Sequence, residues 1–75
     1  MSVKIYFSSR NHAPVLIRSI KTGLEQGKTV EVYTDSSTAF SKAGEAILDA
    51  NLEATISKEN DLPKYILEPE QHGKV

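Results

Sequence analysis

The sequence predicts a two-layer α/β domain in which both helices cover one face of a four-stranded mixed sheet. One pattern occurs twice: a strand of alternating apolar residues leads through a polar turn into a helix with an apolar stripe. Two more strand-like segments follow, so the predicted order is β-α-β-α-β-β. Because strand–helix–strand connections are right-handed almost without exception, we expect both helices on the same side of the sheet.

Four segments carry the pattern of a strand. They cover residues 3–8, 29–34, 52–57 and 64–68. Apolar side chains of the first three segments alternate with polar ones, which leaves the second face of the sheet open to water or to a partner. The side chains expected on this open face are Lys4, Tyr6, Glu31, Tyr33, Glu53 and Thr55. Pro63 restricts the last strand to an edge of the sheet or marks its first residue.

The two predicted helices are bounded by residues that favour helix ends. Pro14 suits the first turn of the first helix, and Gly27 is placed to end it. The second helix follows the capping candidates at 35–38 and ends at Asn51. Gly44 in its middle costs roughly 1 kcal/mol relative to Ala. We therefore expect Gly44 to mark a close approach to another backbone, either that of the first helix or that of a partner chain.

Length and composition narrow the class of protein. With 75 residues and no cysteine, the chain forms one small domain that neither a disulfide nor a thiolate metal site supports, which leaves dimerisation as a source of stability. No apolar run approaches the roughly 18 residues of a membrane span, and the first residues lack the apolar region of a secretory signal. We expect a cytoplasmic protein with one domain over residues 1–68 and a flexible tail over 69–75.

Charge is unevenly distributed along the chain. The net charge is −1, yet residues 1–42 hold six basic and three acidic side chains, whereas residues 43–75 hold three basic and seven acidic ones. The uneven distribution is compatible with an ordinary solvated surface or with a basic face that meets an anion. A basic excess this small predicts only weak binding of nucleic acid by each subunit.

The turns after the first two strands hold the candidate binding residues. Ligands of α/β sheets sit at the carboxyl ends of strands, and the helix N-termini found there favour anions. Residues 8–12 line one turn and residues 36–38 the other, with Lys42 one turn into the second helix. The same Ser, Thr and Asn residues also serve as ordinary helix caps, and Asp35 would repel a phosphate.

We find no residue pattern typical of catalysis, a metal site or a cofactor. His12 and His72 are the only histidines, and no glycine-rich phosphate loop is present. Tyr6 and Tyr33 could stack on bases, although tyrosines on an exposed strand also cover sheet surface or form a dimer contact. We therefore expect a protein that is not an enzyme and holds no cofactor or metal.

Two short segments resemble the Alba family of chromatin proteins. Residues 10–15, Arg-Asn-His-Ala-Pro-Val, resemble the Lys-Lys-Pro-Val that follows the first strand of the family. Residues 39–43, Ala-Phe-Ser-Lys-Ala, resemble the Ala-Ile-Ser-Lys-Ala that opens its second helix. The spacing of the two segments and the predicted order of elements also resemble this family, and the related stage V sporulation protein S family, over about residues 3–67.

This resemblance implies a small homodimer that binds DNA or RNA without catalysis. By position, Arg10 and His12 take the place of the first-turn cations of the family, and Lys42 matches the lysine of its second helix. The chain departs from the family before the second helix, where residues 34–38 hold an acid and no cation. It departs again at residues 58–61, which are short and acidic where the family has an arm that reaches into the minor groove.

Our leading prediction from the sequence is a non-catalytic nucleic-acid-binding protein of low sequence specificity. The predicted contact residues are Arg10, His12, Lys42, Arg18 and Lys58. The alternative is a small regulator, of the kind that viruses or plasmids encode, which binds a host protein through its acidic half or its open sheet face. A third interpretation is a site for a small phosphorylated ligand at the strand ends.

Overall fold

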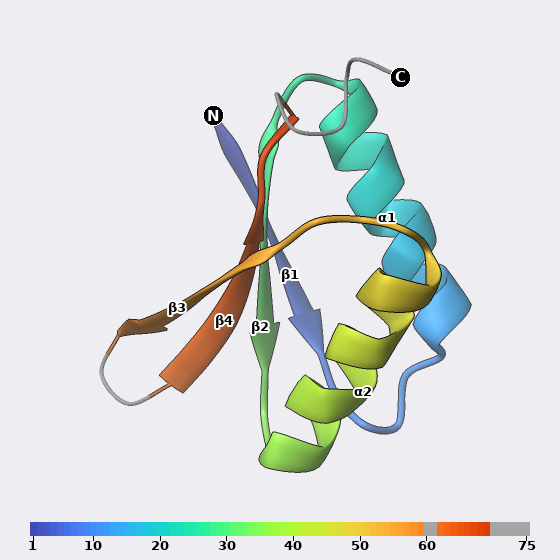
Figure 1. The fold of residues 1–75 in the computed structure, drawn as a ribbon, viewed down its shortest axis with the longest axis vertical. Helices are drawn as coiled ribbons and strands as arrows, with labels where there is room; N and C mark the ends of the chain where they lie inside the picture. The colour runs from blue at the N-terminus through green and yellow to red at the C-terminus, as the bar shows by residue number, and fades with distance from the viewer. Residues whose placement is uncertain (60–61, 70–75) are drawn as a thin grey trace.

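The computed structural model describes residues 1–59 and 62–69, and it has the predicted order of elements (Figure 1). The elements are β1 (Ser2–Phe7), α1 (Ala13–Glu25), β2 (Thr29–Thr34), α2 (Ser37–Asp49), β3 (Thr55–Glu59) and β4 (Leu62–Leu67). The predicted α/β class and β-α-β-α-β-β order are therefore confirmed. Of the tail expected over 69–75, residues 70–75 lie outside the described residues.

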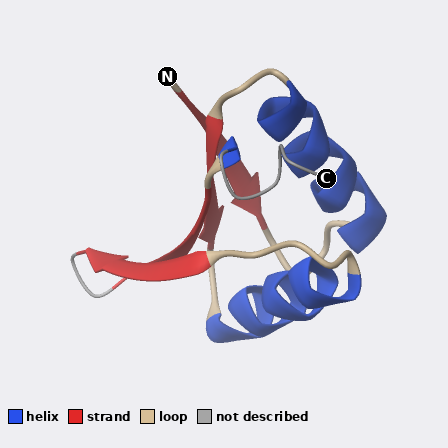
Figure 2. Cartoon of the chain, turned by 45° about the horizontal axis from the view of Figure 1, so that its top comes forward, coloured by secondary structure: helices blue, strands red, loops and turns tan. Residues whose placement is uncertain are grey.

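The four strands form one mixed sheet in the order β1-β2-β4-β3. β1 and β2 are parallel, whereas β4 is antiparallel to both of its neighbours, β2 and β3. Both helices lie on the same side of this sheet, as Figures 1 and 2 show from two directions. The arrangement expected from right-handed connections is therefore the one observed.

The core lies between the sheet and the two helices. Its buried residues are Phe7, Leu16, Ile20, Val30, Val32, Ala39, Ala43, Ile47, Tyr65 and Leu67. Val30 and Val32 are fully buried, as the alternation along β2 predicts. In α1 the buried apolar side chains are those of Leu16 and Ile20, while Ile17 is only partly buried against the core.

The helices end where the sequence predicts. Gly27 and Asn51 both have positive φ angles, of 75° and 63°, after the last turns of α1 and α2. Among the capping candidates before α2, Ser36 is the cap, and its side-chain oxygen accepts a hydrogen bond of 3.1 Å from the Ala39 N–H. Pro14 lies in the first turn of α1, where its missing N–H leaves no gap in the helix.

The third strand differs from the prediction of 52–57. It begins three residues later, at Thr55, because Leu52 and Ala54 pack against the core before the chain joins the sheet. Their alternation is the same as that of a paired strand, which explains the wrong boundary. Lys58 and Glu59, which follow the predicted third strand, lie in β3, and residues 60 and 61 lie outside the described residues.

Pro63 also lies where neither expectation put it. β4 is an inner strand rather than an edge strand, and Pro63 is its second residue rather than its first. It pairs with Lys58 of β3 but lies beyond Tyr33–Lys64, the last pair between β2 and β4. In the described pairing, β4 therefore has a neighbour on one side only at this position, where the missing N–H of a proline is tolerated as it is on an edge.

The close approach at Gly44 is to a side chain, so the expectation of a neighbouring helix backbone is wrong. A Cβ added at Gly44 would collide with the Tyr65 hydroxyl. That hydroxyl donates a 2.8 Å hydrogen bond to the Phe40 carbonyl oxygen, and the two rings stack with their centroids 4.3 Å apart. Burial raises the pKa of Tyr65, which keeps the phenol in its donating form. Gly44 thus leaves room for the contact that fastens β4 to α2.

We expect Gly44→Ala to destabilise the fold although Ala is favoured over Gly in a helix by about 1 kcal/mol. The added methyl group would displace the Tyr65 hydroxyl from its acceptor. Tyr65→Phe alone should cost about 0.5–1.5 kcal/mol through the lost hydrogen bond. In the Tyr65→Phe background, Gly44→Ala should become neutral or stabilising. Urea unfolding of the four proteins measures this coupling, and additive free energies would contradict the contact.

Candidate nucleic-acid interface

The loop between β1 and α1 is closed by its own hydrogen bonds. The Ser8 N–H donates to Asn11 Oδ1 at 2.9 Å, and the Asn11 N–H donates back to the Ser8 carbonyl at 3.0 Å. The Arg10 N–H donates to Ser8 Oγ at 3.3 Å. The side chain of Arg10 is exposed on this closed turn. His12 follows as the N-cap residue of α1, also exposed, and its side chain makes no capping hydrogen bond.

Lys42 joins this loop from α2. Its Nζ donates hydrogen bonds to the carbonyl oxygens of Ser9 and Asn11, at 2.9 and 3.0 Å. The same atom lies 5.9 Å from the centroid of the Phe7 ring. The ammonium group of α2 therefore lies against the backbone on both sides of Arg10. The order of elements predicts Lys42 at this edge of the sheet, but no pattern in the sequence indicates that it holds the loop.

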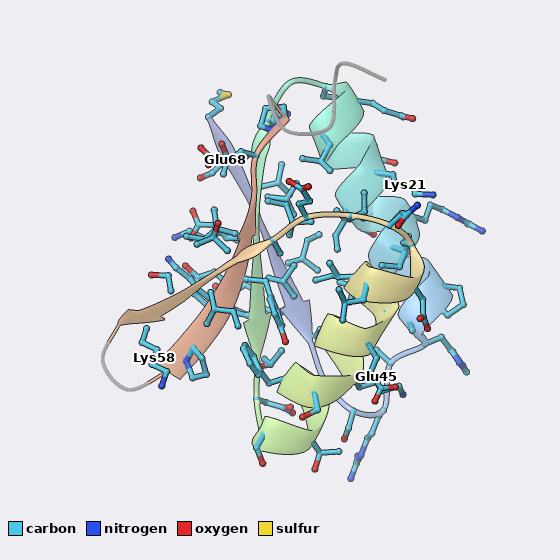
Figure 3. All side chains as sticks on the ribbon, viewed as in Figure 1. Lys21, Glu45, Lys58 and Glu68 are labelled. Atoms are coloured by element: carbon cyan, nitrogen blue, oxygen red, sulfur yellow. The ribbon has the colours of Figure 1, made fainter. Side chains whose placement is uncertain are left out.

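The five predicted contact residues do not form one surface. Arg10, His12 and Lys42 belong to the loop between β1 and α1 or contact it, and together we call them the cationic rim. Arg18 lies further along α1. Lys58 lies on β3, which extends away from the helices that carry Lys21 and Glu45 (Figure 3).

Arg18 lines an open groove of about 640 Å³ between the two helices. Ala13, Ile17 and Ala46 contribute apolar surface to this groove. The charged side chains that line it are Arg18, Lys21, Glu25 and Asp49. Because these are two cations and two anions, the groove does not extend the cationic rim as a basic surface.

The start of α2 is a weaker anion site than its serines suggested. Ser36 uses its side-chain oxygen to cap the helix, and this occupies the Ala39 N–H. Asp35 is exposed immediately before that cap, where its charge opposes an anion. Residues 36–38 therefore add little that attracts a phosphate, and α2 contributes Lys42 to the rim.

A charged pair lies at the centre of the open sheet face. Lys64 Nζ of β4 donates to Glu31 Oε1 of β2 at 2.8 Å, with side-chain exposures of only 11% and 17%. The Tyr33 hydroxyl donates to the same carboxylate oxygen at 2.8 Å, and Lys64 Nζ donates to the Tyr33 hydroxyl at 3.2 Å. The hydrogen bonds from Lys64 and Tyr33 lower the pKa of Glu31 below its ordinary value.

Two tyrosines stack beside this pair. Tyr6 of β1 and Tyr33 of β2 are register partners, and their ring centroids lie 5.3 Å apart with an interplanar angle of 25°. Tyr6 remains 74% exposed. A hollow of about 200 Å³ at the carboxyl ends of the two strands is lined by both tyrosines and by Ser8 and Asn11 of the loop. Alternation along the strands predicted the tyrosine face, but nothing in the sequence predicted the hollow.

The Glu31–Lys64 pair makes the fold sensitive to acid. A carboxylate whose pKa is lower in the folded state contributes stability above its ordinary pKa of 4.5, and that stability is lost as the pH falls through the lower folded value. Glu31→Gln should therefore lower the free energy of unfolding at neutral pH and flatten its decline below pH 4.5. Urea unfolding over a pH series measures both effects.

The matched control for this experiment is Glu45→Gln, which removes an exposed carboxylate on α2 (Figure 3). Its stability profile should stay parallel to that of the wild-type protein. If the Glu31→Gln profile were also parallel to wild type at every pH, the ion pair would not contribute to the acid sensitivity.

Within residues 1–59 and 62–69, no group of three or more His, Asp or Glu side chains is arranged to hold a metal ion. Neither helix in this part of the chain has the length and apolar character of a membrane span. Comparisons with models of protein families, with curated proteins and with solved structures found no match to this chain.

Proposed function

We propose that this chain binds nucleic acid without catalysis, through contacts between the cationic rim and backbone phosphates. One observation carries the proposal: Lys42 Nζ lies 2.9 and 3.0 Å from the carbonyl oxygens of Ser9 and Asn11. Ser9 and Asn11 are the neighbours of Arg10 in the sequence, and His12 is the residue after Asn11. Two segments that are far apart in sequence therefore contribute positive charge to one end of the sheet.

The chemistry of the rim suits a phosphate. A guanidinium group presents a planar set of donors that matches two phosphate oxygens, and the Arg10 side chain is exposed and free to approach them. α1 begins beside it without a side-chain cap, but Pro14 has no N–H, and the N–H groups of Val15 and Leu16 donate to the His12 carbonyl oxygen. The support for a phosphate therefore comes from the side chains of the rim rather than from the start of the helix. Lys42 contributes charge from a fixed position, because two of its donors already hold the loop.

The number of cations sets the strength and the salt dependence of binding. Non-specific complexes of this kind have dissociation constants on the order of 10⁻⁴–10⁻⁶ M, and each phosphate contact adds about 0.7–0.9 to the slope of log affinity against log salt. The rim therefore supports weak binding that salt abolishes readily. A homodimer, which the sequence led us to expect, would present two rims and gain affinity by avidity. A cytoplasmic location, expected from the sequence, stays part of the proposal.

Contacts by Arg18 and Lys58 are less well supported than those of the rim. Arg18 lies in a groove with as many acidic as basic side chains, and Lys58 lies on the strand pair that extends away from the helices. We therefore assign the phosphate contacts to Arg10, His12 and Lys42.

Fluorescence anisotropy with labelled DNA and RNA over a salt series tests the proposal. Arg10→Ala should weaken binding to every sequence alike and lower the salt slope by about 1. The matched control is Lys28→Ala, which removes one positive charge before β2, at the opposite end of the sheet. An equal loss in both variants, or no binding by the wild-type protein at low salt, would overturn the proposed interface.

A further inference from the structure

We infer that the nucleic acid is single-stranded and that one of its bases stacks on Tyr6, over the hollow beside the cationic rim. The inference rests on the proposed function and adds to it the form of the substrate and a second point of contact. It is carried by the tyrosine stack, by the hollow and by the charge around them.

The stack presents an aromatic surface that is held from below. The Tyr33 ring is fixed by its hydroxyl bond to Glu31 and by Lys64 Nζ, 5.1 Å from the ring centroid. Tyr6 rests on Tyr33, which covers one face of the Tyr6 ring, while 74% of the residue remains exposed. A planar base can therefore stack on the exposed part of the Tyr6 ring that borders the hollow, with little loss of side-chain freedom, because Tyr6 is already held in place.

The hollow connects this surface to the phosphate site. Tyr6 and Tyr33 line one part of it, and Ser8 and Asn11 line another, on either side of Arg10 in the chain. Its volume of about 200 Å³ is smaller than pockets for drug-sized ligands, which measure roughly 300–1,000 Å³, and suits one ring system. One nucleotide can thus contact both places, with its base at the tyrosines and its phosphate at Arg10.

The charges around the hollow favour the base there and the phosphate at Arg10. Asp35 lines the hollow and would repel a phosphate there, whereas its carboxylate can accept hydrogen bonds from the amino group of a base. Arg10, on the loop, provides the positive charge for the phosphate. Glu31 adds little repulsion on the open face, because Lys64 pairs with it at 2.8 Å.

The same features argue for a strand of nucleic acid rather than a protein on this face. Charged residues are depleted from the cores of protein–protein interfaces, yet the centre of this face is the Glu31–Lys64 pair. Bases in a duplex are stacked on one another and cannot stack on a tyrosine, so the contact selects unpaired strands. The duplex form would keep only the contacts of the cationic rim.

The test compares a labelled single-stranded oligonucleotide with the same sequence in a duplex. Tyr6→Ala should weaken single-strand binding by roughly 5- to 150-fold and leave duplex binding unchanged. Tyr6→Phe keeps the ring and should bind as the wild type does. Tyr6→Leu keeps an apolar cover on Tyr33 without a ring and should behave like Tyr6→Ala. Thermal unfolding of each variant checks that the fold is intact.

Intrinsic fluorescence gives a second readout that a purely structural role of Tyr6 would not change. The sequence holds three tyrosines and no tryptophan, so emission reports on tyrosine alone. A single strand should quench this tyrosine emission in the wild-type protein. The quenching should be weaker in Tyr6→Phe, because the residue that stacks on the base no longer contributes tyrosine emission. If Tyr6→Ala bound single strands as tightly as wild type while Arg10→Ala weakened both forms, the stacking inference would fail and the proposed function would stand. If neither form bound, both would fail.

Discussion

The position of β4 between β2 and β3 determines both faces of the sheet. Two adjacent residues of this strand serve opposite sides, because successive side chains of a strand alternate. Tyr65 faces the helices and binds the Phe40 carbonyl of α2 in the space left by Gly44. Lys64 faces away and pairs with Glu31 of β2. A single inner strand thus fastens a helix on one side and completes a charged pair on the other.

Lys42 has a related double role at the end of the sheet. Its two hydrogen bonds to loop carbonyls fix the turn that bears Arg10, so its removal changes the shape of the rim as well as its charge. Here the bonds to Ser9 and Asn11 use most of the donor capacity of the ammonium, and the exposed guanidinium of Arg10 is the better partner for a phosphate.

The alternation of apolar residues and the residues at helix ends predicted the strands and helix boundaries that depend on neighbouring residues in the sequence. The alternation at residues 3–7 and 29–34 gave β1 and β2 with the correct inward faces, and Gly27 and Asn51 gave the helix ends. The start of β3 was wrong because Leu52 alternates like a strand residue while packing on the core. The inner place of β4 depends on contacts between distant segments, which periodicity within a segment does not encode.

The candidate site shows the same division. The β-α-β order alone brought Arg10 and Lys42 to one edge of the sheet, since the carboxyl ends of parallel strands meet there. The bonds of Lys42 to the loop and the hollow beside Tyr6 depend on the path of the loop at residues 8–11, which no sequence pattern specified. The direction of β3 decides that Lys58 lies apart from the rim, and this too follows only from the three-dimensional pairing of strands.

Net charge is a poor guide to what the chain can bind, because composition does not distinguish paired charges from free ones. A total of −1 argues against nucleic acid if every acidic residue repels it. Glu31, however, is held by Lys64 and by the Tyr33 hydroxyl, so its charge is balanced within the open face. Asp35 repels a phosphate from the hollow but not a base. The arrangement of charge therefore permits an anion at the rim and an uncharged aromatic ring beside it, which is the division of groups within a nucleotide.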